Sequence, residues 1–138
     1  MNSAVFFDTN VLVYFLSDAG ERTVVAENLL VQGGVISIQV LSEMVSVARR
    51  KFRMTWAEVR SARDKALVFC PSPVPLTENI HRSAMDIGSR YGFTIYDSLI
   101  LAAALKAGCT TVYSEDMQHG QVVEGLRIEN PFGHLPKP

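Results

Sequence analysis

The sequence predicts a three-layer α/β fold, in which a central, mostly parallel sheet of about five strands lies between helices. Short apolar runs bounded by turn residues alternate with segments of helical periodicity along the chain. With 138 residues and no repeat, low-complexity tract or linker, residues 1–138 are expected to form one domain. An apolar fraction of 48% and a charged fraction of 20% argue against intrinsic disorder.

Five short apolar runs are expected to form the strands. The first, Ala4-Val5-Phe6-Phe7, is continuously apolar, as in a strand that is covered on both faces. The third lies in a proline-rich segment and is expected to be short. The expected strands span residues 4–7, 35–38, 74–76, 110–113 and 126–128.

Six segments between these runs have helical patterns. The second ends before Gly33-Gly34, and the fourth begins at Thr55, which forms a capping-box pattern with Glu58. The sixth is apolar nearly all round, which is typical of a buried helix. The expected helices span residues 11–16, 21–31, 39–52, 55–70, 77–91 and 95–106.

Composition excludes several classes of protein. The formal net charge of −1 does not itself indicate a nucleic-acid partner. Two cysteines without a Cys-x-x-Cys motif, and three widely spaced histidines, argue against a disulfide framework and a zinc site. No apolar stretch reaches the roughly 18–20 residues of a membrane span. The N-terminus lacks the basic lead-in of a signal peptide, so a cytoplasmic protein with reduced thiols is expected.

Four acidic residues follow predicted strand ends or begin predicted helices. Asp8 comes directly after the first strand, and Asp116 follows the fourth. Glu43 lies in the second turn of the third helix, and Asp97 lies in the first turn of the apolar sixth helix. Because ligands bind beyond the carboxyl ends of parallel strands, we expect these carboxylates to converge there.

Taken singly, most of these acids also have a structural explanation. Asp8 suits a helix N-cap, Asp97 a capping box with Thr94, and Asp116 an Asx turn, whereas Glu43 has no obvious local partner. Taken together, four converging carboxylates repel one another unless a cation neutralises them. Oxygen ligands without cysteine or a histidine pair favour Mg²⁺ or Mn²⁺, which indicates metal-assisted hydrolysis of a phosphodiester.

Four acidic segments occur in order along nearly the whole chain. They are Phe7-Asp8-Thr9-Asn10-Val11-Leu12, Val40-Leu41-Ser42-Glu43, Ile95-Tyr96-Asp97-Ser98-Leu99-Ile100 and Tyr113-Ser114-Glu115-Asp116-Met117. In order, spacing and flanking character they resemble the four acidic motifs of PIN-domain nucleases. The single-domain size resembles the VapC-type toxins of bacterial and archaeal toxin–antitoxin pairs.

The resemblance implies an endoribonuclease that needs Mg²⁺ or Mn²⁺ and leaves 5′-phosphate and 3′-hydroxyl ends. It implies that Asp8 and Asp97 are the principal metal ligands and that Glu43 and Asp116 complete the catalytic set. Asn10 and Ser114 stand where the family has polar residues that orient the acids. Glu115 is an alternative to Asp116, which the Ser-x-Asp spacing favours. The resemblance also implies a homodimer and a small cognate antitoxin.

A basic run lies at the far end of the helix that carries Glu43. Arg49, Arg50, Lys51 and Arg53 are candidates for binding the phosphate backbone of RNA, or they complement the dipole at the helix C-terminus. Trp56 follows them, and partial burial in the core or a dimer contact is favoured there over stacking on a base.

Two other functions remain open. An aspartyl-phosphate enzyme would use Asp8 as a nucleophile, but Asn10 stands where haloacid dehalogenases have a second aspartate, and the last strand lacks the lysine of a receiver domain. A non-catalytic PIN-like scaffold that binds RNA is the second alternative, and the intact acidic set argues against it.

Overall fold

A computed structural model describes residues 4–137. Residues 4–137 form a four-stranded mixed sheet and six helices, and the predicted α/β class is confirmed. In chain order the elements are β1 (Val5–Phe7), α1 (Thr9–Leu16), α2 (Glu21–Val31), α3 (Ile38–Arg50), α4 (Trp56–Phe69), α5 (Glu78–Tyr91), α6 (Ile95–Lys106), β2 (Thr111–Tyr113), β3 (Val122–Val123) and β4 (Leu126–Glu129).

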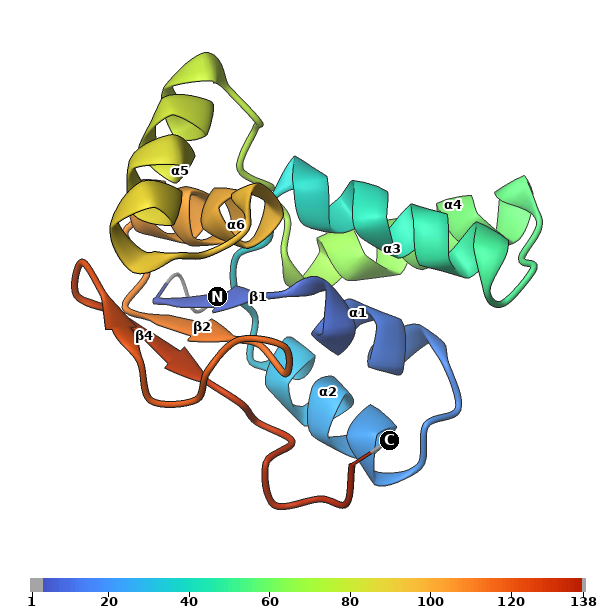
Figure 1. Cartoon of the computed structure of the whole chain (residues 1–138). Helices are drawn as coiled ribbons and strands as arrows, with labels where there is room; N and C mark the ends of the chain where they lie inside the picture. The colour runs from blue at the N-terminus through green and yellow to red at the C-terminus, as the bar shows by residue number, and fades with distance from the viewer. Residues whose placement is uncertain (1–3, 138) are drawn as a thin grey trace.

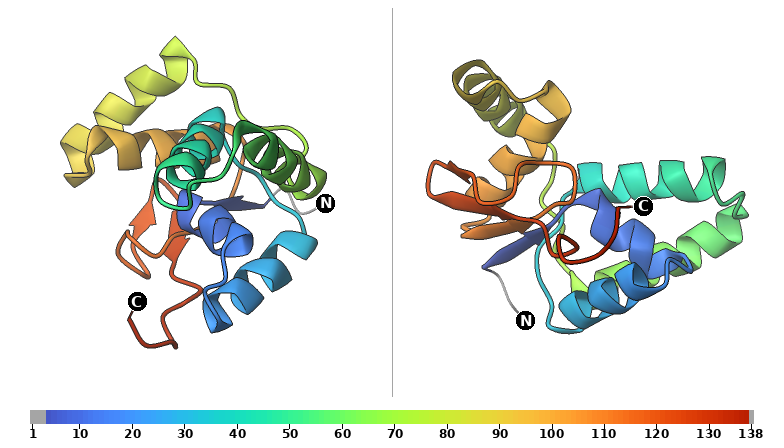
Figure 2. Two further views of the ribbon diagram at one scale, coloured as in Figure 1. Left: turned by 90° about the vertical axis from the view of Figure 1, so that its right-hand side faces the viewer. Right: turned by 60° about the horizontal axis from the view of Figure 1, so that its bottom comes forward.

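The sheet has the strand order β1-β2-β4-β3, with β1, β2 and β4 parallel and β3 antiparallel to β4. Phe6, Val112 and Ile128 lie side by side at its centre and are fully buried. Figure 1 shows α5 and α6 over one face of the sheet, with α2 on the other side. Helices α3 and α4 pair and project to one side of the sheet, as Figure 1 and the right view of Figure 2 show.

Two of the five expected strands are single bridges. Val35 bridges Phe6 and Val74 bridges Ser37, both in parallel, so these segments extend the sheet beyond β1 without forming longer strands. Pro73 and Pro75 flank Val74, and a proline has no N–H to continue a ladder. The segment 35–38 ends early because the Ser37 hydroxyl accepts a hydrogen bond from the backbone N–H of Val40 and begins α3 at Ile38.

The short hairpin of β3 and β4 was not expected. Its turn consists of Glu124 and Gly125, with φ angles of 51° and 85°. Two left-handed residues in succession suit the right-handed twist of a two-residue hairpin. Glutamate is a weak signal for such a turn, so the sequence does not reveal it.

The helices follow their predicted signals closely. Thr55 and Glu58 form both hydrogen bonds of the capping box, and Gly92 ends α5 at a φ of 81°. In α6, every residue from Ser98 to Ala104 is buried, as an all-round apolar helix requires. Cys70 and Cys109 are both buried. Within residues 4–137, none of the helices is long and apolar enough to span a bilayer.

Candidate active site

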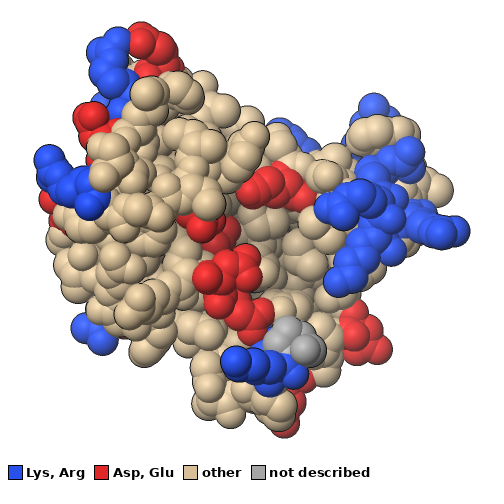
Figure 3. Space-filling view, in the orientation of Figure 1, with Lys and Arg blue, Asp and Glu red and all other residues tan. Residues whose placement is uncertain are grey.

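An open cleft of about 460 Å³ lies beyond the carboxyl end of β1. The four predicted acids all line this cleft, although they come from four different parts of the chain. Figure 3 shows acidic side chains gathered in a hollow at the centre of one face, with a basic cluster beside it. The residues that line the cleft and belong to the predicted set are Asp8, Asn10, Glu43, Arg50, Lys51, Asp97 and Asp116.

Asp8 is the most buried of the four acids, with only 4% of its surface exposed. One carboxylate oxygen, Oδ1, accepts a hydrogen bond of 2.7 Å from the backbone N–H of Thr9 as α1 begins. The other, Oδ2, accepts a bond of 2.7 Å from the Ser114 hydroxyl. Burial is the main cause that raises the pKa of Asp8 to about 6; the charges of Asp116 and Glu43 add to it, and the two hydrogen bonds oppose it.

Ser114 connects Asp8 to the loop after β2. Its hydroxyl is fully buried and donates to Asp8, while the same oxygen accepts hydrogen bonds of 3.3 Å from the backbone N–H groups of Asp116 and Met117. The Ser114 side chain therefore holds both the Asp8 carboxylate and the turn that carries Asp116. Asn10 makes no such link, because its Oδ1 is buried without a hydrogen-bond partner among the described residues.

Glu43 has partners that the sequence did not indicate. The Thr9 hydroxyl donates to its Oε2 at 3.2 Å, and Gln39, one helical turn earlier, donates to its Oε1 at 3.4 Å. The Gln39 amide also donates to the backbone carbonyl of Tyr96 at 3.1 Å. Gln39 thereby joins α3 to the start of α6, next to Asp97, and was missed because its second partner is 57 residues away.

Asp97 serves two purposes at once. Its backbone N–H donates to the Thr94 hydroxyl at 3.2 Å, so it is part of the cap of α6. Its half-buried carboxylate lines the cleft. Burial raises the pKa of Asp97, and the charge of Asp116 contributes in the same direction.

Glu115 and Asp116 point to different surroundings. Glu115 accepts two hydrogen bonds from Arg22, at 2.9 and 3.0 Å, and one from the Tyr14 hydroxyl. This ion pair is largely buried, with 12% of the Arg22 side chain and 14% of the Glu115 side chain exposed. Burial and the Glu115 carboxylate together raise the pKa of Tyr14 to about 12. Asp116 is therefore the neighbour that faces the cleft.

The cleft suits a hard divalent cation by its chemistry. Its acidic lining residues offer carboxylate oxygens, its buried Asn10 oxygen has no hydrogen-bond partner among residues 4–137, and repulsion among its acids contributes to the raised pKa values of Asp8 and Asp97. Among residues 4–137, no three acidic, histidine or cysteine side chains lie close enough to hold an ion in their present positions. A cation among the carboxylates would offset the repulsion that keeps such groups apart.

Positive charge is concentrated beside the cleft. Seven of the 13 lysines and arginines fall between residues 49 and 65, although the net charge of the whole chain is only −1. Arg50 and Lys51 line the cleft itself. Arg49 donates to the carbonyl of Met54 at 2.9 Å, and Arg53 is exposed with a φ of 53°. The basic cluster in Figure 3 covers this end of α3 and α4.

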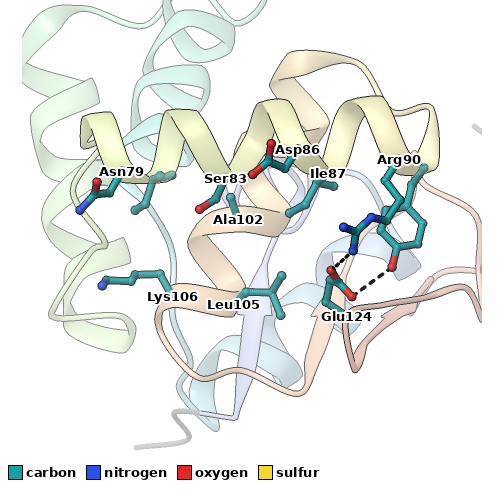
Figure 4. A pocket seen from close by; sticks show the side chains of 11 residues that line it. Asn79, Ser83, Asp86, Ile87, Arg90, Ala102, Leu105, Lys106 and Glu124 are labelled. Atoms are coloured by element: carbon teal, nitrogen blue, oxygen red, sulfur yellow. Dashed lines mark hydrogen bonds and ion pairs between the residues drawn. The ribbon is translucent and has the colours of Figure 1, made fainter.

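A second groove, of about 420 Å³, lies between α5 and α6 (Figure 4). Glu124 of the hairpin turn closes one end, where it accepts bonds of 2.6 Å from Arg90 and 3.2 Å from Tyr91. None of the four acidic residues lines this groove. We assign it no part in the chemistry of the cleft.

Residues 5–124 match the PIN domain family. The chain belongs to the PIN domain family. The four acidic residues that line the cleft all lie within the matched residues. None of the curated proteins compared with the sequence matches it.

Solved structures of VapC toxins and toxin–antitoxin complexes share the fold of this PIN domain. A toxin–antitoxin complex from Klebsiella pneumoniae has a TM-score of 0.70 at 18% identity, covering 92% of this chain and 97% of that one. VapBC2 from Rickettsia felis, bound to a promoter DNA fragment, has a TM-score of 0.63 at 19% identity, with 91% and 97% covered. Mycobacterium tuberculosis VapC20, a toxin that cleaves the sarcin–ricin loop, has a TM-score of 0.62 at 20% identity, with 81% and 89% covered.

Proposed function

We propose that this PIN domain is an endoribonuclease that depends on Mg²⁺ or Mn²⁺ and is the toxin of a type II toxin–antitoxin pair. The observation that carries the proposal is the convergence of Asp8, Glu43, Asp97 and Asp116 on one open cleft in a PIN fold. Oxygen ligands of this kind are those that Mg²⁺ and Mn²⁺ prefer.

Asp8 and Asp97 are the principal ligands in this proposal, and Glu43 and Asp116 complete the set. A divalent ion held there would supply a nucleophile from water at neutral pH and neutralise charge on the scissile phosphate. Ser114 holds the Asp8 carboxylate and the Asp116 turn in place, while Thr9 and Gln39 orient Glu43. These contacts fix the directions in which the carboxylate oxygens face the cleft.

Arg50 and Lys51 are proposed to hold the RNA backbone at the cleft. Both line the same cavity as the acids, so a phosphate bound by either one lies next to the carboxylates. Phosphate contacts of this kind supply affinity without sequence preference. They also offset the repulsion that the acidic cleft exerts on RNA.

The toxin assignment rests on similarity in fold to solved toxin–antitoxin complexes. A small cognate antitoxin, a homodimer and a cytoplasmic location are therefore part of the proposal. Val24 and Val31 on α2 are 55% and 66% exposed and offer an apolar surface for the antitoxin. Growth arrest on expression of the chain alone, relieved by a gene encoded beside it, would support this part.

The activity is tested with purified protein and total cellular RNA, with Mg²⁺, Mn²⁺ or EDTA, and with new 5′-phosphate ends counted by sequencing. We expect Asp97→Asn to reduce cleavage by more than the roughly 10- to 100-fold that loss of a ligand's hydrogen-bonding partner costs. Asp86→Asn, an exposed acid in the second groove, is the matched control and should cleave normally. Equal cleavage by wild type and Asp97→Asn, or cleavage in EDTA, would exclude the proposed site.

A non-catalytic scaffold would behave differently toward metal. The nuclease should gain thermal stability in millimolar Mg²⁺ or Mn²⁺, because an ion that binds only the folded state stabilises it. Asp97→Asn should lose most of that gain. A folded wild type with no gain and no cleavage would favour the scaffold.

A further inference from the structure

Glu115 is bound at both of its carboxylate oxygens, whereas its neighbour Asp116 faces the cleft. Oε1 accepts a hydrogen bond from the Tyr14 hydroxyl, and Oε2 accepts bonds of 3.0 and 2.9 Å from Nε and Nη2 of Arg22. Tyr14 belongs to α1 and Arg22 to α2, so two helices from the start of the chain hold a residue of the loop after β2. We call Tyr14, Arg22 and Glu115 the Glu115 network.

Aromatic packing fixes the Glu115 network in place. The Arg22 guanidinium lies 5.8 Å from the centre of the Tyr14 ring and 6.0 Å from that of Phe132. The two rings meet edge to face with their centres 4.9 Å apart, and Phe132 is only 1% exposed. The Thr23 hydroxyl donates to the backbone carbonyl of Tyr14 at 2.8 Å and joins α2 to α1. Because a guanidinium packed against two rings has few other positions, Arg22 is a rigid support for Glu115.

The turn that carries Asp116 is held from two sides. The buried Ser114 hydroxyl accepts hydrogen bonds from the backbone N–H groups of Asp116 and Met117, but both are 3.3 Å long, beyond the usual range. Glu115 lies in the same turn, and its side chain is bound to α1 and α2. Asp116 follows Glu115 directly, so a shift of Glu115 reaches Asp116 through one peptide bond. The Glu115 network thus reinforces the weak hydrogen bonds of Ser114.

The Glu115 network also neutralises a fifth carboxylate beside the cleft. Tyr14 lines the cleft, so the Glu115 carboxylate lies one hydrogen bond behind its wall. Without Arg22, the charge of Glu115 would repel the four acids that line the cleft. A buried ion pair often adds no stability over apolar residues of similar volume. The place of this ion pair beside Asp116 therefore indicates a role in the geometry of the site.

We propose that Arg22 is a positioning residue for the metal site: with Tyr14 it holds Glu115, and it thereby fixes the direction in which Asp116 faces the cleft. The proposal rests on the proposed function, in which Asp116 helps to hold a divalent ion. Arg22 and Glu115 are not among the residues that line the cleft, so they act through Asp116 and not on the substrate. The affinity for the ion then depends on a residue of α2 outside the cleft.

The test replaces the buried ion pair by apolar residues of similar length. Arg22→Met/Glu115→Met removes both charges together, so its free energy of unfolding should equal or exceed that of the wild type. Its dissociation constant for Mn²⁺, measured by electron paramagnetic resonance of the free ion, should nevertheless rise roughly 10- to 100-fold. Glu78→Met/Arg82→Met, the same replacement in an exposed ion pair of α5, is the matched control and should bind Mn²⁺ as the wild type does.

A further substitution shows whether the ion pair acts through Asp116. Asp116→Asn alone should weaken Mn²⁺ binding. In the Arg22→Met/Glu115→Met background it should add little, because the carboxylate that it removes is already misplaced. Losses that add independently would overturn the positioning role, since the ion pair would then affect the ion by another route.

Hydrogen exchange of the Asp116 and Met117 amides reports on the turn without any metal, because both amides donate to Ser114. In EDTA they should exchange at least roughly 10-fold faster in Arg22→Met/Glu115→Met, while amides of the buried helix α6 keep their wild-type rates. Tyr14→Phe removes only the hydroxyl that donates to Glu115 and keeps the packed ring. It should accelerate the same two amides to a smaller extent, and wild-type rates would overturn the positioning role even if the double variant does not fold.

The two proposals fail in different ways. Faster exchange of the two amides, with no Mn²⁺ binding and no cleavage by the wild type, would refute the nuclease and keep Arg22 as the residue that positions the Asp116 turn. Cleavage by the wild type, with wild-type Mn²⁺ affinity and exchange rates in Arg22→Met/Glu115→Met, would refute the positioning role and keep the nuclease. Faster exchange with unchanged Mn²⁺ affinity in that variant would also overturn the positioning role.

Discussion

Replacement of Asp8 by asparagine should stabilise the metal-free protein at neutral pH. The folded-state pKa of about 6 exceeds the unfolded value of 3.8, so the folded state binds this proton more tightly. The stabilising contribution of Asp8 is therefore complete below about pH 4 and is lost as the pH rises through 6. The difference of about two pH units corresponds to about 3 kcal/mol that the ionised carboxylate costs the folded state.

The measurement is urea unfolding of wild type and Asp8→Asn in EDTA, at pH 4 and at pH 7.5. At pH 4 the two proteins should have nearly the same free energy of unfolding, since both folded states then carry a neutral group at this position. At pH 7.5 Asp8→Asn should be more stable, by up to about 3 kcal/mol. Added Mg²⁺ should narrow this gap, because the ion binds wild type and not the variant.

Asp18→Asn is the control, since Asp18 is exposed in the loop after α1. It should change the free energy of unfolding by less than about 0.5 kcal/mol at either pH. A loss of stability in Asp8→Asn that is the same at both pH values would refute the reasoning. In that event the pKa of Asp8 would be the same in the folded and unfolded states, and burial would not raise it.

Two further predictions concern neighbours of the cleft. Ser114→Ala should lower the free energy of unfolding by about 2 kcal/mol at pH 7.5, because Asp8 loses a hydrogen bond to a charged group; an unchanged urea midpoint would contradict this. Arg50→Glu should weaken RNA binding, and the slope of log affinity against log salt should become shallower by about 0.7 for each phosphate that is no longer neutralised, as measured by anisotropy at several salt concentrations. Arg82→Glu reverses the charge of an exposed residue on α5 and is the control, so it should leave both the RNA affinity and the salt slope unchanged. Equal effects of the two charge reversals would show that Arg50 does not bind RNA.

The site residues could be predicted where the signals of single strands and helices agree with the rule for where parallel sheets bind ligands. Asp8 follows a strand whose apolar run is unmistakable, and Asp97 begins a helix whose cap and apolar character are both evident in the sequence. The rule that ligands bind at the carboxyl ends of parallel strands then brings the segments together without coordinates. That rule does not decide whether Glu115 or Asp116 faces the cleft, and only the Ser-x-Asp spacing favours Asp116. The ion pair that holds Glu115 is formed with Arg22, which lies 93 residues away in the sequence.

The fold was less predictable where pairing is short or turns are unusual. Val74 has strand character, yet its flanking prolines limit it to one bridge. The Glu124-Gly125 turn lacks the asparagine or aspartate that marks most hairpins of its type, so β3 was missed. The exposure of Trp56 was also mispredicted, because an aromatic residue at a helix start is as compatible with packing as with exposure.

The most direct test of the metal site is a crystal structure of the wild-type protein grown with Mn²⁺, with anomalous scattering recorded for the ion. The strongest anomalous peak should lie in the cleft, in contact with carboxylate oxygens of both Asp8 and Asp97. A cleft without a peak at saturating Mn²⁺, or a peak that contacts neither carboxylate, would contradict the account.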